Sequence, residues 1–154
     1  MIQLIDNIRK TRAFVLDIIK ELSLEKLNKV PHGFNNNIIW NVGHLVAGQQ
    51  TICYIRCGKQ ISISEEFFNN FKPGTKPERF IQSDEEDDIK KMLFTSLDIL
   101  EKDFQQNIFE PYQPWITRTG ININNINEAL IYLHHHEGVH TGVISSLKRL
   151  VQKM

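Results

Sequence analysis

The sequence predicts an all-α fold, and within that class a four-helix bundle. Four stretches of about 20 residues carry apolar side chains at helical spacing, and no segment shows a convincing strand-like alternation of apolar and polar residues. Two long connections, near residues 58–82 and 105–122, contain prolines and glycines that exclude a long helix. Connections of this length favour crossovers over a simple up-down-up-down order, and 154 residues fit a single domain spanning 1–154.

The N-terminal half is expected to hold two of the helices. Residues 2–22 form an amphipathic stripe, with charged residues between its apolar positions: Leu4, Ile8, Val15, Ile18, Ile19 and Leu22. The segment KVPHGFNNN then ends this helix, and its asparagines can cap a second helix over residues 38–56.

The C-terminal half is expected to hold the other two helices. Ser83 followed by DEEDD is typical of a helix start, because a capping hydroxyl precedes carboxylates that suit the positive helix end. The Asn-rich INNIN segment opens the last helix, which should run to about Val151. Between the second and third helices, SEEFFNNF is long enough for only a turn or two.

Charge and composition exclude several classes of function. Eighteen Lys and Arg balance eighteen Asp and Glu, so the chain lacks the positive field that nucleic-acid binding normally needs. The first 22 residues mix charges with apolar residues and resemble neither a signal peptide nor a membrane span. We therefore expect a cytoplasmic protein without nucleic-acid or membrane partners, in which Cys53 and Cys57 remain thiols on a different helix face from the candidate site.

Histidines cluster on the predicted last helix, in the run LHHHEGVH. His136 and His140 fall where the apolar stripe of this helix lacks a member, and they lie about 40° apart on consecutive turns. Both imidazoles can therefore reach one ion, whereas His134 should face solvent and His135 a flank. Burying these two imidazoles without hydrogen-bond partners, on the apolar face that packs in the core, would cost about 1 to 3 kcal/mol of folding free energy each. A bound metal removes this cost.

The HExxH pattern at residues 136–140 also suggests a zinc protease, but the rest of the chain opposes it. That class takes a further ligand from beyond the motif helix, and TGVISSLKRLVQKM contains no His, Asp, Glu or Cys. A third ligand must come from upstream. His44 in IIWNVGHLVAG lies on the seam face of the second helix and is the best candidate, with His32 in reserve.

Other residues near these helix positions are candidates for the site. Glu137 is placed to act as general base or to support a ligand imidazole, and equally to be a solvated residue at the edge of the seam. Asn37 and Asn41 can line a substrate pocket or cap the helix, and Trp40 can wall the pocket or simply pack in the core. A further set could form a lid in the connection before the last helix: Trp115, Arg118 and Thr119.

Two segments resemble a known family. NNIIWNVGHLVAGQQ is similar to the second-helix motif of the DinB-like (DinB/YfiT) superfamily, and HEGVHTGVISSLKRL to its last-helix motif. The resemblance implies a DinB-like four-helix bundle with crossover topology, in which His44, His136 and His140 form a triad for a divalent metal, typically zinc or nickel. It also implies a homodimer and an enzyme acting on a small molecule, as a thiol S-transferase using a low-molecular-weight thiol or as a hydrolase.

The sequence leaves one reading from another class open. The chain could be a noncatalytic, stress-induced helical bundle in which a metal is structural or absent. An open coordination position separates the two, because structural zinc is usually closed by four protein ligands whereas a catalytic site keeps one position free.

Overall fold

A computed structural model describes residues 1–153. Most of this chain is helical, and a small two-stranded sheet is the only strand structure within the described residues. In chain order the elements are α1 (Ile2–Ile19), α2 (Leu24–Asn28), α3 (Ile38–Gln49), the π-helical η1 (Gln50–Tyr54), the 3₁₀-helical η2 (Ile55–Cys57), α4 (Glu65–Phe71), α5 (Ser83–Gln105), β1 (Trp115–Ile116), β2 (Asn122–Ile123) and α6 (Ile126–Gln152).

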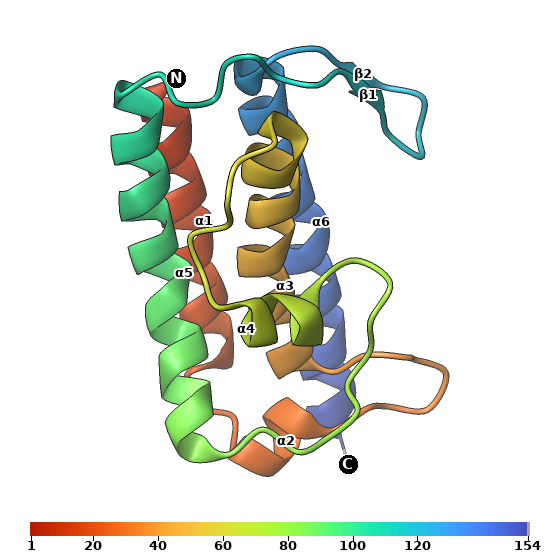
Figure 1. Ribbon diagram of the computed structural model, residues 1–154. Helices are drawn as coiled ribbons and strands as arrows, with labels where there is room; N and C mark the ends of the chain where they lie inside the picture. Colours follow the sequence, from red (N-terminus) through yellow and green to blue (C-terminus); the bar gives the residue numbers. More distant parts are fainter. Residues whose placement is uncertain (154) are drawn as a thin grey trace.

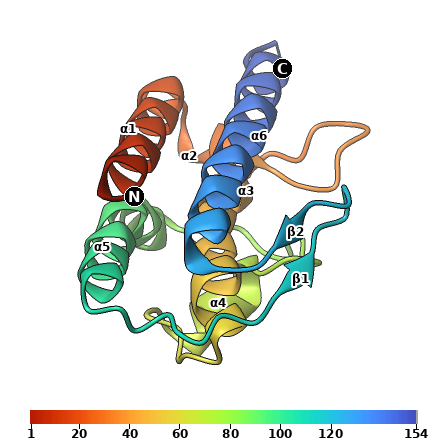
Figure 2. The ribbon, with the colours of Figure 1, turned by 90° about the horizontal axis from the view of Figure 1, so that it is seen from above.

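The four long helices α1, α3, α5 and α6 pack as a bundle (Figures 1 and 2). Helix α1 lies beside α5 and α6, and α3 lies beside the same two helices, so α1 and α3 are diagonal to each other. Helices α3 and α5 run in the same direction, which requires the chain to return along the bundle between them. The predicted all-α bundle with a crossover connection is therefore confirmed.

Asparagine side chains start the two helices that carry the candidate histidines. The Asn37 side chain accepts a hydrogen bond from the backbone N–H of Trp40, and Asn125 accepts one from that of Glu128. These bonds satisfy amide groups that have no partner within the helix. The prediction for the third helix was less accurate, because Ser83 is the first helical residue and Gln82 occupies the cap position without a side-chain cap hydrogen bond.

Two helix ends and one small sheet differ from the prediction. The first helix ends at Ile19, so Leu22 lies in the turn before the separate short helix α2, which Ser23 caps. Helix α3 changes after Gln49 into the π and 3₁₀ turns η1 and η2. Strands β1 and β2 pair antiparallel and are only two residues each, too short for an alternating pattern to show in the sequence.

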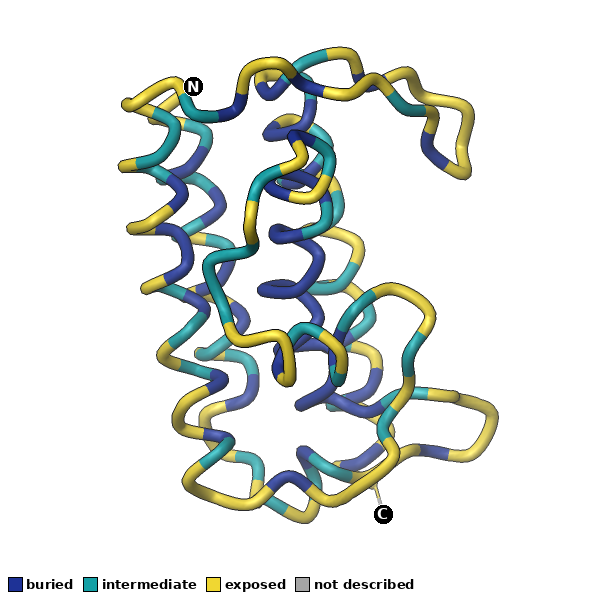
Figure 3. The backbone as a smooth tube through the Cα atoms, in the orientation of Figure 1, coloured by how far each residue is buried: buried dark blue, intermediate teal, exposed yellow. Residues whose placement is uncertain are grey.

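The apolar core consists of two clusters, one toward each end of the bundle. The inner faces of the long helices are buried, and most exposed positions lie on their outer faces and in the connections (Figure 3). At the level between the clusters the four long helices contribute a hydrogen-bonded set of buried polar residues: Arg12, Gln49, Ser96 and Glu137. This polar layer lies at the same height as the candidate histidines.

Within residues 1–153, no helix is both long enough and apolar enough to span a bilayer.

Candidate metal centre

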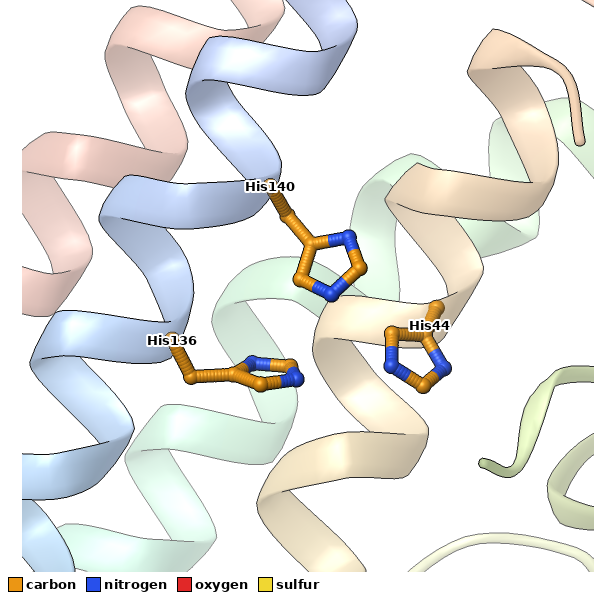
Figure 4. A group of neighbouring side chains, drawn as sticks. All are labelled: His44, His136 and His140. Atoms are coloured by element: carbon orange, nitrogen blue, oxygen red, sulfur yellow. The ribbon is translucent and has the colours of Figure 1, made fainter. Parts of the chain in front are cut away.

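Three histidines from two facing helices come together in the bundle (Figure 4). His44 lies on α3, and His136 and His140 lie one turn apart on α6. One ring nitrogen from each residue can be chosen so that all three atoms lie within 4.8 Å of one another. Helices α3 and α6 run antiparallel, so residues far apart in sequence meet at a single level.

The orientation of His44 is fixed on both sides of its ring. Its Nδ1 lies 2.7 Å from the backbone oxygen of Phe71, which can only accept a hydrogen bond, so Nδ1 carries the proton. The indole of Trp40 stacks on the imidazole with 4.7 Å between ring centroids and 13° between planes. His44 is only 5% exposed, and its unprotonated Nε2 is left as the nitrogen available for coordination.

His140 is fixed in the same way by a side chain from the opposite helix. Its Nδ1 lies 2.9 Å from Oδ1 of Asn41, and the amide nitrogen of Asn41 donates to the backbone oxygen of Asn37 at 2.7 Å. Because the amide nitrogen is already used, Oδ1 faces the imidazole and accepts a hydrogen bond from its Nδ1–H. The hydrogen bond therefore leaves Nε2 of His140 free and also joins α3 to α6.

His136 is positioned by close packing. A Cβ atom built on Gly48 would lie 2.8 Å from Cε1 of His136, closer than real contacts allow, so the ring occupies space that only glycine leaves open. Its Nδ1 is buried and has no hydrogen-bond partner among the described residues. Figure 4 shows the opposite edge of the ring turned toward His44, and the two ring centroids lie 5.3 Å apart.

Burial makes all three imidazoles neutral at physiological pH. It lowers the pKa of His44, although the hydrogen bond to Phe71 opposes this shift. Burial, and then the charge that His44 would carry, lower the pKa of His140 to about 4. Burial together with the neighbouring His140 and His44 lowers the pKa of His136 to about 2. Neutral rings offer lone pairs, which is the form in which histidine coordinates metals.

This donor set suits a transition-metal ion. Imidazole nitrogen is a preferred ligand of zinc, nickel and copper, and two of the three rings are oriented by hydrogen bonds at the other nitrogen, as in known metal sites. Three converging lone pairs repel one another unless a cation lies between them. No Cys, Asp or Glu among the described residues joins the group, so the protein offers three ligands.

Glu137 lies in surroundings that neither sequence interpretation anticipated. Its side chain is fully buried, so it is not a solvated residue at the edge of the seam. The carboxylate forms an ion pair with Arg12 of α1, with a shortest distance of 2.7 Å, and makes no hydrogen bond to a histidine of the cluster. Burial raises the pKa of Glu137, and the guanidinium beside it opposes that shift.

The stripe of α6 explains why this placement was missed. The heptad-like series Ile126, Leu130, Leu133, Glu137, His140, Ile144, Leu147 and Val151 faces the bundle, and Glu137 occupies its central buried position. His136 and His140 are only partly buried. The sequence signal for a buried Glu137 was a charged residue at a position where the apolar stripe of α6 continues on both sides. Arg12 interrupts the apolar stripe of α1 in the same way.

The remaining candidates lie outside the cluster. His134 is half-buried and His135 exposed, the reverse of the prediction, because the helix face is rotated relative to the assumed seam. His32 is exposed. Cys53 and Cys57 are free, buried thiols that pack in the core away from the three histidines.

The predicted lid residues belong to the β1–β2 hairpin. Trp115 is half-buried beneath the guanidinium of Arg56, 4.6 Å from the ring centroid, and its ring also meets Tyr132 edge-on. Arg118 and Thr119 are exposed at the turn. The hairpin therefore packs against one end of the bundle, next to α6.

A pocket of about 910 Å³ lies beside the histidine cluster, against the start of α3 and against α4 and the loop after it. Two of the predicted pocket residues, Asn37 and Trp40, line it, but Asn41 and the three histidines do not. Trp40 separates the pocket from His44, and its indole N–H donates to Thr75 at 3.2 Å. The other lining residues come from the start of α3 and from α4 and the loop after it: Asn35, Ile39, Asn69, Asn70, Phe71, Gly74, Thr75, Lys76, Pro77, Glu78, Arg79 and Ile81.

Comparison with known proteins agrees with the fold. The family model of the DinB superfamily matches residues 7–144, which cover most of the chain and include all three histidines. The chain therefore belongs to the DinB superfamily, as the two sequence motifs predicted. A search of curated proteins gives no match.

Proposed function

We propose that this protein is a metal-dependent enzyme acting on a small molecule, with one divalent ion, zinc or nickel, held by His44, His136 and His140. The observation that carries the proposal is the convergence of three neutral imidazoles, two of them with the proton fixed on Nδ1. We favour thiol S-transfer over hydrolysis, with a low-molecular-weight thiol as one substrate.

The ligand set supports catalysis over a purely structural role. Three neutral imidazoles leave the charge of a divalent ion uncompensated and at least one position open, and such an ion lowers the pKa of a thiol or water held there. The chain's own contribution is to keep the imidazoles neutral through burial and to fix two of them through Phe71 and Asn41. Glu137 has no part in this proposal as a base, because Arg12 engages its carboxylate.

The surroundings of the cluster support a small substrate. The indole of Trp40 stacks on His44 and also lines the neighbouring pocket. Asn37 lines the same pocket. A volume of about 910 Å³ is within the range of small-molecule sites. A cytoplasmic location and a homodimer remain predictions that accompany this proposal.

The metal is tested first, by elemental analysis of untagged protein purified without added metal. We expect about one zinc or nickel per chain in the wild type and almost none in His44→Ala. His135→Ala is the matched control, because this exposed histidine on α6 can hold adventitious metal but lies outside the cluster. Metal that persists in His44→Ala would refute the cross-helix site.

The open position is tested by spectroscopy on the Co²⁺-substituted protein. Adding cysteine or glutathione should produce a thiolate-to-metal charge-transfer absorption, and the loaded protein should then transfer the thiol to 1-chloro-2,4-dinitrobenzene with release of chloride and a proton. Hydrolysis of a p-nitrophenyl ester without thiol transfer would favour the hydrolase alternative. A cobalt spectrum unchanged by thiol, with neither activity, would favour the noncatalytic bundle.

A further inference from the structure

Arg12 makes the most extensively bonded side-chain contact in the bundle core. It is 0% exposed, and its Nε and one terminal nitrogen donate to the carboxylate of Glu137 on α6. The same terminal nitrogen donates to the backbone oxygen of Leu45 on α3 at 3.0 Å. Its other terminal nitrogen donates to Leu93 and Ser96 on α5. All five N–H groups of the guanidinium can thus be satisfied.

Two of the residues that Arg12 contacts are sequence neighbours of the candidate ligands. Leu45 follows His44 directly, and Glu137 follows His136 directly. One guanidinium from α1, a helix that supplies no ligand, therefore holds together the two helices that do, at the level of the cluster. The hydrogen bond between His140 and Asn41 makes a second cross-link between the same two helices.

We propose that Arg12 and Glu137 are positioning residues for the metal site, which set the spacing and register of α3 against α6 so that the three imidazoles converge. This inference rests on the proposed function. Its basis is geometric: a planar guanidinium fixes distance and direction at several bonds at once, whereas apolar packing tolerates small shifts. Neither residue touches the metal or substrate in this assignment.

A contribution to folding stability does not by itself explain why the buried ion pair of Arg12 and Glu137 is present. Buried ion pairs lose much of their Coulomb attraction to desolvation, and well-packed apolar residues of similar volume often replace them without loss of stability. The four polar residues also interrupt an otherwise continuous apolar core. A positioning role explains why they lie at the height of the histidines.

The test separates positioning from folding with a double variant, Arg12→Met with Glu137→Leu, which removes both charges together. Denaturation midpoints, the affinity for Co²⁺ alone and the cobalt absorption spectrum are measured on each protein. Leu100→Ala is the matched control, because Leu100 is a fully buried core residue of α5 with no bond to the network. Arg12→Lys, which keeps the charge but loses the fork, is the intermediate case.

We expect the double variant to retain a midpoint near that of the wild type but to bind Co²⁺ at least about tenfold more weakly, with an altered spectrum. Leu100→Ala should show the opposite pattern, with a lower midpoint and unchanged affinity. Wild-type affinity and spectrum in the double variant would overturn the proposal. An affinity that only follows the midpoint across all variants would also overturn it.

A metal-free measurement distinguishes failure of this inference from failure of the proposed function. The ring N–H of His140, bonded to Asn41, can be followed by NMR in the apo protein. Its protected signal should be present in the wild type and lost in the double variant if the helices lose their register. If the wild type binds no metal but the double variant still loses this signal, the metal-dependent function is refuted and the positioning role remains. A signal preserved in the double variant would refute the positioning role.

Discussion

At the scale of the residue, close packing orients one of the candidate ligands and hydrogen bonds orient the other two. His136 has no hydrogen bond to its buried Nδ1, so its orientation depends on the space beside Gly48. His44 and His140 are instead held through their Nδ1 atoms by Phe71 and Asn41. A glycine in the middle of a helix is unfavourable by about 1 kcal/mol relative to alanine, so its presence in α3 indicates a steric need.

The substitution Gly48→Ala tests this steric need. The new Cβ would displace the His136 ring, so we expect metal affinity to fall at least about tenfold, measured by competition with a chromogenic chelator. Gly142→Ala is the matched control on α6, since no heavy atom lies within 4 Å of a Cβ built there. It should leave metal affinity unchanged and raise the free energy of unfolding by up to about 1 kcal/mol. Equal affinities in the two variants would contradict the steric account.

At the scale of the element, the start of α3 determines where the first ligand and its support lie. The Asn37 side chain caps this helix through Trp40 and donates to the backbone oxygen of Asn28 at 2.8 Å. The Asn37 backbone oxygen also accepts from Asn41, the residue that orients His140. The cap therefore lies at the beginning of the segment that carries Trp40, Asn41 and His44.

Replacing the cap should lower stability by a predictable amount. Asn37→Ala should reduce the free energy of unfolding by about 1 kcal/mol relative to Asn37→Ser, because serine can still accept from the helix N–H groups. Both variants lose the tie to Asn28, so their difference isolates the cap. Urea denaturation gives both values, and identical curves for the two variants would show that the cap contributes nothing.

At the scale of the whole molecule, burying three histidines together makes stability depend on pH. Burial and the neighbouring His44 lower the pKa of His140 from 6.5 to about 4 in the folded protein. Between these values the unfolded chain binds more protons than the folded chain, so stability increases with pH. The contribution is complete above about 6.5 and is progressively lost as pH falls toward about 4.

We therefore expect the metal-free protein to lose stability on acidification over this window, as measured by urea denaturation at a series of pH values. In His140→Ala, stability should depend less steeply on pH over this window. A dependence should remain there and at lower pH, because the pKa of His136 is lowered to about 2. His135→Ala, at an exposed position on the same helix, should follow the wild-type slope. A wild-type slope in His140→Ala would rule out His140 as a source of the effect.

Local patterns in the sequence were sufficient for the helices and for the identity of the three histidines. Helical periodicity, Asn-rich caps and Pro/Gly connections predicted the four long helices, because each depends on side chains within a few residues of one another. The spacing of His136 and His140, one turn apart, depends only on helix geometry. The lack of a further ligand after His140, and the position of His44 on the core-facing side of the second helix, added His44 to the same set.

Only the tertiary structure decided which residues meet across helices. Three contacts depend on how each helix is rotated and how high it lies in the bundle: the pairing of Arg12 with Glu137, the hydrogen bond from His140 to Asn41 and the packing of His136 beside Gly48. Because each residue along a helix points about 100° away from the one before it, a shift of one residue would present a different face. A charged residue in an apolar stripe shows in the sequence, but its partner is 125 positions away. Periodicity therefore determined the helices, and packing determined the surroundings of the site.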